Sequence, residues 1–261
     1  MHPVAFRDPF ERTAQVTSVA VIPARYASTR FPGKPLAEIA GRPMIEHVYC
    51  RAAEARGVDA VVVATDDERV AAAVERFGGI ARMTGAHHRT GLDRIAEVAR
   101  DLQCSIVVNV QGDEPLVDPS AISSMIDALR GDPDLQMATL RTPIRSEADY
   151  ANPHVVKVVV DGNDDALYFS RAPIPLHRER PPQGGHYAYK HLGLYAYRRD
   201  FLLRLAALPQ TALEQAESLE QLRALEHGHR IRAVETEHDS IGVDTPEDLE
   251  RVRETAASTP L

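Results

Sequence analysis

Short apolar segments alternate with amphipathic ones through the first half of this chain, and this alternation constrains its fold more than any other feature. Apolar stretches over residues 19–23, 60–64 and 105–111 predict strands that are buried on both faces, as in a parallel sheet. A 3.6-residue apolar period predicts helices between them, over residues 44–56 and 92–102. We therefore expect an α/β fold with a doubly wound, mostly parallel sheet.

The remaining elements follow from the same patterns and from capping residues. Further helices are predicted over 119–130, 199–208 and 217–226, and another after a cap at Asp66 or Asp67. A last helix is predicted from Pro246 onwards, where Thr245 is the cap and Asp248 completes an approximate capping box. Further strands are predicted over 80–83, 137–141 and 191–197. Beyond Thr142 the rhythm changes, and residues 155–160 and 166–170 are predicted to pair as a hairpin. The Pro-, Arg- and Gly-rich loop over 172–185 is a candidate mobile lid.

Three cations follow the first predicted strand on one loop: Arg25, Arg30 and Lys34. The whole chain carries a formal net charge of −8, so an overall excess of positive charge does not explain three cations on one loop. Guanidinium and ammonium groups bind phosphate oxygens, and open α/β sheets bind ligands beyond the carboxyl ends of their strands. A solvated loop with ordinary surface charges is the alternative. Because the loop follows a core strand, we favour a polyphosphate site, although neither a G-x-G-x-x-G nor a P-loop motif occurs.

Two acidic residues follow other predicted strands. Asp113 lies two residues beyond Gln111, at the sheet edge that also carries Arg25, and Asp244 lies in a turn after Gly242. Two carboxylates ~4 Å apart repel by about 4 kcal/mol at an effective dielectric near 20. A Mg²⁺ ion would remove that repulsion and suits oxygen ligands and phosphates. Each aspartate alone is better explained as a turn or helix-entry residue, and their combination with the cationic loop favours a metal site.

Composition argues against several classes of protein. An isoelectric point of about 5.8 and the absence of Trp argue against nucleic-acid binding. No apolar run approaches the ~20 residues of a membrane helix, and the N-terminus lacks the apolar segment of a secretory signal. Cys50 and Cys104 form no zinc spacing or disulfide framework, so we interpret them as small core residues. We therefore expect a cytoplasmic protein with neither nucleic-acid nor membrane partners.

Six segments spread along the chain form a specific combination. They are residues 25–36, 108–115, 168–172, 191–193, 219–223 and 242–250. Each segment alone is a modest signal, but their number and order resemble the 3-deoxy-manno-octulosonate cytidylyltransferase (CMP-Kdo synthetase) family, over roughly residues 19–252. The resemblance implies a Rossmann-like nucleotidyltransferase sheet, with an inserted hairpin and lid subdomain used for dimerisation.

The resemblance also implies an activity and its partners. The expected enzyme is a Mg²⁺-dependent nucleotidyltransferase that transfers CMP from CTP to 3-deoxy-D-manno-octulosonate (Kdo). It would release pyrophosphate and give CMP-Kdo for lipopolysaccharide biosynthesis. Its partners would be CTP, Kdo and a second copy of the chain, as a homodimer.

Roles for individual residues follow from the same resemblance. The catalytic residues would be Lys34, Arg25 and Asp113, and Mg²⁺ would be held by Asp113 and Asp244. The nucleotide would be bound by Arg25, Arg30, Lys34, Asp66, Arg94 and Gln111. The sugar acid would be bound by Gln111, Arg171, His191, Tyr195, Glu220 and Gln221, with Arg171 facing its carboxylate.

The expected organisation is a single domain between two tails. Residues 1–18 are expected to be a disordered extension and 255–261 a tail, with the domain over 19–254. Within it we expect a nucleotide-binding half at about 19–141, a sugar-binding and dimerisation subdomain at about 142–212, and a closing segment over 213–254.

Two alternatives stay open at this point. A cytidylyltransferase for another sugar acid, an 8-amino Kdo analogue or a sialate, would share the cationic loop. A non-enzymatic regulator would bind CTP without turnover. Arg171, His191 and the Glu220-Gln221 pair favour Kdo among the sugar acids.

Overall fold

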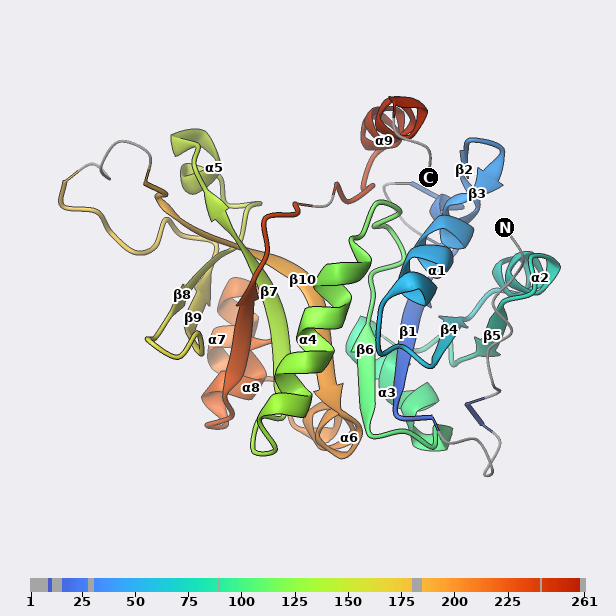
Figure 1. Ribbon diagram of the computed structural model, residues 1–261, viewed down its shortest axis with the longest axis horizontal. Coiled ribbons are helices and arrows are strands. Elements are labelled where there is room, and N and C mark those ends of the chain that lie inside the picture. The colour runs from blue at the N-terminus through green and yellow to red at the C-terminus, as the bar shows by residue number, and fades with distance from the viewer. Residues whose placement is uncertain are drawn as a thin grey trace. The chain divides into compact units, whose positions relative to one another are not determined.

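The computed structural model describes residues 9–10, 16–27, 31–88, 90–179, 185–239 and 241–258. The chain divides into two compact units, shown in Figure 1. The first unit comprises Met1–Ile126 and Ser240–Leu261, and the second unit comprises Asp127–Asp239. Among the residues described, no helix is both long enough and apolar enough to span a bilayer.

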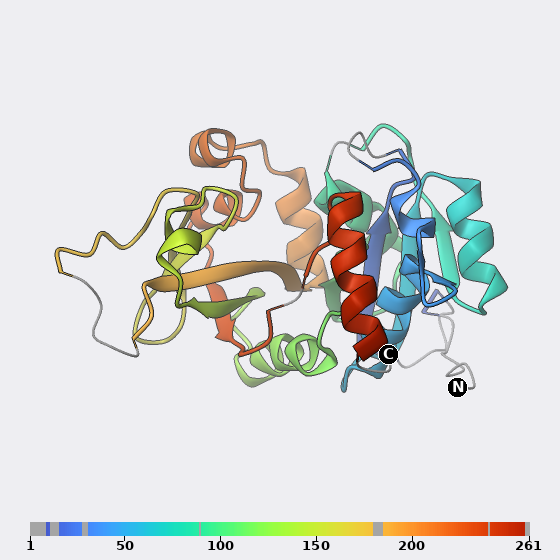
Figure 2. The ribbon, with the colours of Figure 1, turned by 90° about the horizontal axis from the view of Figure 1, so that it is seen from above.

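The sheet of the first unit is parallel, as its apolar strands predicted. Its strands are β1 (Ser18–Ala24), β4 (Ala60–Thr65), β5 (Ile80–Met83) and β6 (Ile106–Asn109), in the order β6–β1–β4–β5. Val19 of β1 is in register with Ala60 of β4 and with Val107 of β6. All six residues of β4 are buried, because helices cover both faces of this sheet. Figures 1 and 2 show α1 (Met44–Glu54) and α3 (Gly91–Asp101) on opposite sides of it.

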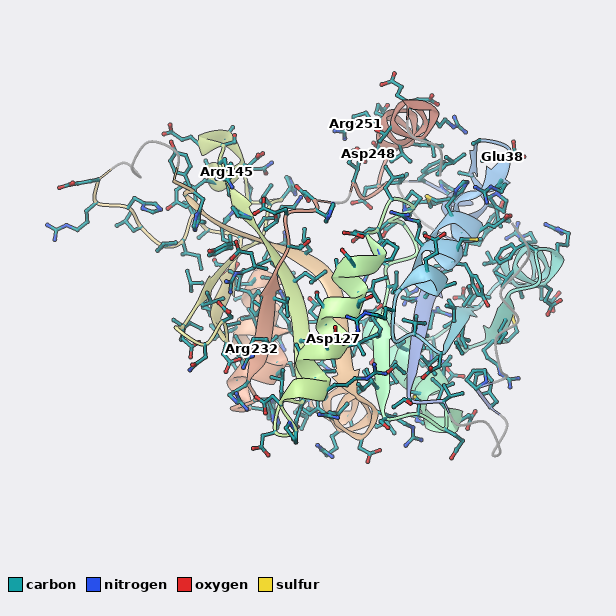
Figure 3. The ribbon with its side chains drawn as sticks, in the orientation of Figure 1. Glu38, Asp127, Arg145, Arg232, Asp248 and Arg251 are labelled. Atoms are coloured by element: carbon teal, nitrogen blue, oxygen red, sulfur yellow. The ribbon has the colours of Figure 1, made fainter. Side chains whose placement is uncertain are left out.

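Capping residues start the other helices of the first unit where the sequence predicted them. α2 (Glu68–Arg76) begins after Asp67, whose carboxylate accepts the Arg69 amide at 2.9 Å. α9 (Pro246–Ser258) begins with a capping box, in which the Thr245 amide donates to the Asp248 carboxylate at 3.0 Å and the Asp248 amide donates to Thr245 Oγ1 at 3.2 Å. Figure 3 shows Asp248 beside Arg251, with which it forms an ion pair.

Three short elements precede α1, and the sequence patterns did not predict them. They are the 3₁₀ turn η1 (Lys34–Leu36) and the two-stranded sheet of β2 (Glu38–Ile39) and β3 (Arg42–Pro43). Ile39, Met44, Val243 and Leu249 form a small buried cluster with Val252, which anchors α9 to this part of the first unit.

Residues 16–18, which we expected within a disordered extension, belong to the fold. Val16 and Ser18 are buried, and the amides of Thr17 and Ser18 donate to the Asp59 carboxylate at 2.7 and 3.0 Å. A side-chain acceptor 42 and 41 residues away satisfies these two amides, and such a contact leaves no local signal in the sequence. Residues 1–8 and 11–15 of the expected extension lie outside the described residues.

The second unit is built on an antiparallel arrangement. β7 (Met137–Ile144) pairs in parallel with β11 (Ile231–Glu235) and antiparallel with β10 (Ala188–Arg198). β10 also pairs with β8 (Lys157–Val160), which forms the predicted hairpin with β9 (Ala166–Ser170), as Figure 1 shows. The division between the units falls within α4 (Pro119–Gly131), earlier than the change of rhythm at Thr142, because β7 pairs with strands of the second unit.

One helix of the second unit differs from its prediction. The unit contains α5 (Glu147–Ala151), α6 (Arg199–Ala207), α7 (Ala212–Glu217) and α8 (Leu222–Glu226). A single helix over 217–226 is wrong, because Ser218 adopts a left-handed conformation with φ 53° and ψ 50° that ends α7. α5 and β11 were not predicted. Residues 180–184 of the predicted lid lie outside the described residues.

Candidate functional site

A cavity of about 410 Å³ lies in the first unit at the carboxyl end of β1. Five segments line it: the end of β1, the loop after β1, η1, the start of α3 and the loop after β6. The lining residues are Pro23, Ala24, Arg25, Ala27, Lys34, Pro35, Gly91, Arg94, Gln111, Gly112 and Asp113. Parallel pairing of β1 and β6 places these loops at one sheet edge, where open α/β sheets bind ligands.

A glycine allows two of these loops to meet. A Cβ atom on Gly112 would lie 2.7 Å from the Pro23 carbonyl oxygen and 3.5 Å from Cγ2 of Ile22. The first of these distances is shorter than atoms tolerate, so any larger residue would push the loop after β6 away from the end of β1. The close approach sets the positions of the neighbouring residues Gln111 and Asp113, which line the cavity.

Lys34 and the two predicted aspartates come together in the first unit. The Lys34 ammonium donates to Oδ2 of Asp113 at 2.7 Å and lies 3.4 Å from Oδ1 of Asp244. Gly33, with φ 75°, turns the chain into η1 and donates its amide to the Tyr26 carbonyl at 2.9 Å. The Val243 amide donates to the Asp113 carbonyl at 2.8 Å, which fastens the two acidic loops to each other.

These two carboxylates fit a magnesium site that is completed by a ligand. Mg²⁺ usually takes one or two protein carboxylates and fills its octahedron with phosphate oxygens and water. In the part of the chain that the structure describes, no cluster of three or more His, Cys, Asp or Glu side chains is arranged to hold a metal. Asp113 and Asp244 would therefore hold such an ion together with oxygens from a bound molecule.

Arg25 reaches across the cavity to the loop before α3. Its Nη2 donates to the carbonyl of His88 and lies 3.5 Å from that of Thr90. Thr90 is the N-cap of α3 and accepts the Asp93 amide at 3.2 Å. A guanidinium beside a helix N-terminus makes a favourable environment for an anion. Arg30, the third cation of the predicted cluster, lies outside the described residues.

The loop that accepts Arg25 is fixed to α3 by Glu97. This carboxylate contacts Nε2 of His88 and accepts the Gly85 amide at 3.1 Å. The hydrogen bond from His88, with that from Gly85, lowers the pKa of Glu97. Neither His88 nor Glu97 was expected at the site.

Arg94 and Asp66, both predicted near the nucleotide, form an ion pair in which the arginine is buried and the aspartate is partly exposed. Arg94 is fully buried on α3, and its Nη2 donates to Asp66 Oδ2 at 2.8 Å while Nη1 donates to Thr84 Oγ1. Its Nε has no hydrogen-bond partner among the described residues. A buried donor left unpaired costs about 1–3 kcal/mol, so this guanidinium at the cavity wall is poised to take a further acceptor.

The predicted sugar-acid residues, apart from Gln111, lie in the second unit. His191 on β10 is buried, with Nε2 3.0 Å from Thr139 Oγ1 and ring contacts to Phe169 at 4.8 Å and Tyr195 at 5.5 Å. Burial lowers the pKa of His191 to about 3, so the ring is neutral near pH 7. Burial, and to a lesser extent the nearby Glu220 carboxylate, raises the pKa of Tyr195.

The loop between α7 and α8 carries the other two residues of this set. Gln221 is buried, and its Nε2 has no hydrogen-bond partner within the described part of the chain. The preceding residue, Glu220, is close enough to Tyr195 to affect its ionisation. An amide donor without a partner beside a carboxylate suits a polyhydroxylated ligand, which offers both acceptors and donors.

Arg171 follows β9 and is held by backbone carbonyls. Its Nε donates to Glu217 O at 2.8 Å, Nη1 to Pro153 O at 3.2 Å, and Nη2 lies 3.5 Å from Ser218 O. Two charged residues that the sequence patterns did not single out, Lys157 and Glu217, bind the main chain of this arginine. The signal for Lys157 was a lone charge inside an apolar strand, flanked by valines.

A parallel α/β sheet with cations and carboxylates converging at its strand ends defines a nucleotidyltransferase-like protein. Residues 19–231 match the family model described as cytidylyltransferase. The 3-deoxy-manno-octulosonate cytidylyltransferases of Geobacter sulfurreducens and Pelobacter propionicus are each 57% identical to this chain over 243 residues, which cover 90% of it and 97% and 95% of those proteins. The chain therefore belongs to the cytidylyltransferase family, and within it to the 3-deoxy-manno-octulosonate cytidylyltransferases.

Solved structures agree with this assignment. A structure of CMP:2-keto-3-deoxy-manno-octonic acid synthetase complexed with CTP is 49% identical, with a TM-score of 0.88 over 93% of this chain and 99% of that one. A cytidylyltransferase from Leptospira borgpetersenii is 16% identical, with a TM-score of 0.62 over 95% of this chain and 89% of that one, which is a likeness of fold alone. The predicted family and the predicted α/β class with a mostly parallel, Rossmann-like sheet are confirmed.

The depressed pKa of His191 makes stability depend on pH. The unfolded chain binds a proton at this histidine below its ordinary pKa of about 6.5, whereas the folded chain does so only near pH 3. Its contribution is therefore complete above pH 6.5 and is lost as pH falls towards 3, by up to about 1.4 kcal/mol per pH unit. Urea unfolding at pH 7, 6 and 5 should show a smaller loss of stability in His191→Gln than in the wild type.

The exposed His154 provides a control for this experiment. His154→Gln should keep the pH dependence of the wild type, because folding leaves the His154 side chain exposed to solvent. Equal losses of stability in the wild type and in His191→Gln between pH 7 and 5 would contradict the assignment of a buried, neutral His191.

Proposed function

We propose that this protein transfers CMP from CTP to Kdo, releasing pyrophosphate and forming CMP-Kdo for lipopolysaccharide biosynthesis. The observation that carries the proposal is the convergence of Asp113 and Asp244 on Lys34. Lys34 and Asp113 line a cavity that Arg25 also lines. The chain that carries this arrangement is 49% identical to a CMP:2-keto-3-deoxy-manno-octonic acid synthetase complexed with CTP. Its curated relatives at 57% identity carry the name of the same activity.

Lys34, Arg25 and the N-terminus of α3 supply the charge that a triphosphate needs. The Lys34 ammonium has three N–H donors, of which two are directed at Asp113 and Asp244, so a third can be given to a phosphate oxygen. Arg25 adds a planar fork beside the first residues of α3. Arg30, Asp66, Arg94 and Gln111 complete the proposed nucleotide site.

Transfer of the nucleotide is a displacement at the α-phosphorus. The anomeric hydroxyl oxygen of Kdo bonds to that phosphorus, the bond to the oxygen bridging the β-phosphate breaks, and the hydroxyl proton passes to solvent. Enzymes promote such reactions mainly by positioning and by electrostatic stabilisation. Lys34 would offset the negative charge that grows on the departing pyrophosphate.

A Mg²⁺ requirement forms part of the proposal. Asp113 and Asp244 would hold the ion, with phosphate oxygens among its other ligands. When bound, it would offset the charge of the triphosphate and assist departure of pyrophosphate. The two aspartates support this because they present carboxylate oxygens to one point in the first unit, the Lys34 ammonium.

The second unit would bind the sugar acid. The Arg171 guanidinium would take its carboxylate, because a planar fork matches that group. The neutral His191, with Tyr195, Glu220 and Gln221, would hydrogen-bond its hydroxyl groups.

We also propose that the protein acts as a homodimer in the cytoplasm, as the family resemblance implies. Light scattering of the purified chain measures its oligomeric state.

A pyrophosphate-release assay tests the proposed activity. With Mg²⁺ present, we expect turnover with CTP and Kdo, and at most weak turnover when CTP is replaced by ATP, GTP or UTP. An 8-amino Kdo analogue and sialic acid extend the panel of sugar acids. Turnover with sialic acid alone, or CTP binding without turnover of any sugar acid, would overturn the proposal.

Replacement of Lys34 should mainly reduce turnover. A hydrogen bond to a charged group contributes about 1.5–3 kcal/mol, so Lys34→Gln should lower kcat by at least tenfold. Lys190→Gln is the matched control, because Lys190 also pairs with an aspartate, Asp239 at 2.7 Å, in the second unit. The control should leave kcat within twofold of the wild type, and a full kcat in Lys34→Gln would exclude the role proposed for this residue.

The metal proposal has a direct binding test. Mn²⁺ can replace Mg²⁺ and reports its bound state by electron paramagnetic resonance. Wild-type protein with CTP should bind Mn²⁺, and Asp244→Asn should weaken that binding by tenfold or more, since a carboxylate ligand becomes a neutral amide. Asp239→Asn, in the second unit, should bind Mn²⁺ as the wild type does. Equal Mn²⁺ affinity in all three proteins would show that Asp244 is not a ligand.

A further inference from the structure

Lys157 is one of the few lysines of this chain, and its side chain is fully buried. Only three of the 30 Lys and Arg residues of this chain are lysines, and the side chain of Lys157 is 0% exposed on β8. Its ammonium donates to three backbone carbonyls, those of Asn152 at 2.8 Å, Val155 at 2.6 Å and Arg171 at 2.7 Å. Within the described part of the chain it forms no ion pair.

Core packing does not explain this charge. The residues beside Lys157 in the strand are valines, so an apolar residue would continue the pattern of the strand. Burying a charge without a partner of opposite sign is unfavourable, and burial accordingly lowers the pKa of Lys157. What the ammonium offers is three donors on one tetrahedral nitrogen, which join three carbonyls at one point. Arginine spreads its donors over three nitrogens of a planar fork, so it cannot direct three of them from a single atom.

The three carbonyls belong to two segments that surround Arg171. One is the loop after α5, which contributes Asn152 and Val155, and the other is the end of β9, which contributes Arg171 itself. The loop also contains Pro153, whose carbonyl accepts Nη1 of Arg171 at 3.2 Å. Lys157 therefore fixes both the main chain of Arg171 and a segment that orients its guanidinium.

Glu217 holds the same residue from the other side. Its carboxylate accepts the Arg171 amide at 2.9 Å and the Ser170 hydroxyl at 2.6 Å, and its carbonyl accepts Nε of Arg171 at 2.8 Å. Burial alone would raise the pKa of Glu217, but these hydrogen bonds lower it, so the group is an anion near pH 7. The carbonyl of Arg171 is thus held by a cation and its amide by an anion.

The hydrogen bonds that the structure shows for Arg171 use only some of the N–H donors of its guanidinium. A guanidinium has five N–H donors, and the structure directs three of them at Glu217, Pro153 and Ser218. Within the described part of the chain, one N–H on each terminal nitrogen has no acceptor, and a planar guanidinium can direct two such donors at the two oxygens of a carboxylate. The backbone restraints decide where this fork points.

We propose that Lys157 is a positioning residue for the sugar acid. Its ammonium, together with Glu217, holds Arg171 so that the remaining two donors meet the carboxylate of the substrate. The proposal rests on the function proposed above, in which Arg171 binds that carboxylate. Lys157 itself touches no substrate, so its loss should weaken binding of the sugar acid and leave CTP binding in the first unit unchanged.

A double-mutant cycle on the full chain tests this proposal, with KM for both substrates measured by pyrophosphate release. Lys157→Met should raise KM for Kdo by tenfold or more and change KM for CTP by less than twofold. In an Arg171→Ala background the same substitution should raise KM for Kdo by less than twofold further, because no guanidinium remains to be positioned. A loss of stability alone would not produce this pattern.

Arg198→Met is the matched control. Arg198, the last residue of β10, also donates to backbone carbonyls, those of Leu135 and Asp132 at 3.2 Å and that of Leu129. Its loss should lower the melting temperature and leave both KM values within twofold of the wild type. If Lys157→Met does not fold, Glu217→Gln takes its place in the cycle, with a rise in KM for Kdo of threefold or more that disappears in Arg171→Ala.

The outcomes separate this proposal from the function on which it rests. No turnover of Kdo by the wild type would overturn the proposed function. Turnover by the wild type with an unchanged KM for Kdo in Lys157→Met, or with equal rises for both substrates, would overturn the positioning role alone. Effects of Lys157→Met and Arg171→Ala that multiply in the double variant would also overturn it.

Discussion

Parallel pairing of β1 with β4 and β6 is the constraint on which the candidate nucleotide site depends. The pairing sends the loops after β1 and β6 out of the sheet at the same edge, and the missing side chain of Gly112 lets them approach to van der Waals contact. The Asp113 carboxylate, which follows Gly112 directly, accepts the Lys34 ammonium at 2.7 Å. Asp244 joins them from the far end of the chain, through the hydrogen bond between the Val243 amide and the Asp113 carbonyl.

The two units differ in how the charged side chains of their candidate sites are paired. In the first unit, one ammonium lies between two partly exposed carboxylates, so the three charges can be rearranged when a ligand arrives. In the second unit, the charged groups around Arg171 bind mainly backbone atoms, which cannot move without the chain. An exchangeable arrangement suits a triphosphate and a metal ion, whereas a fixed one suits the shape of a sugar acid.

Local sequence patterns predicted the parts of the structure that local physics determines. The apolar runs of β1 and β4, and the capping residues of α2 and α9, act over a few residues and were predicted. The break between α7 and α8 was not, because Ser218 carries no glycine or proline signal for its left-handed backbone. The roles proposed for Arg25, Lys34 and the aspartates could be inferred from charge and position. The role proposed for Lys157 could not, because its three acceptors are main-chain atoms that only folding brings together.

The scarcity of lysine has a practical consequence for chemical probing. Besides its N-terminus, the chain offers an acylating reagent only three primary amines, at Lys34, Lys157 and Lys190. The side chain of Lys190 is 29% exposed and that of Lys34 14%, whereas Lys157 is sealed from solvent with all three of its N–H bonds engaged. Modification of Lys157 in the native protein would therefore record transient opening of the second unit, and peptide mass spectrometry could follow that opening at a single nitrogen atom.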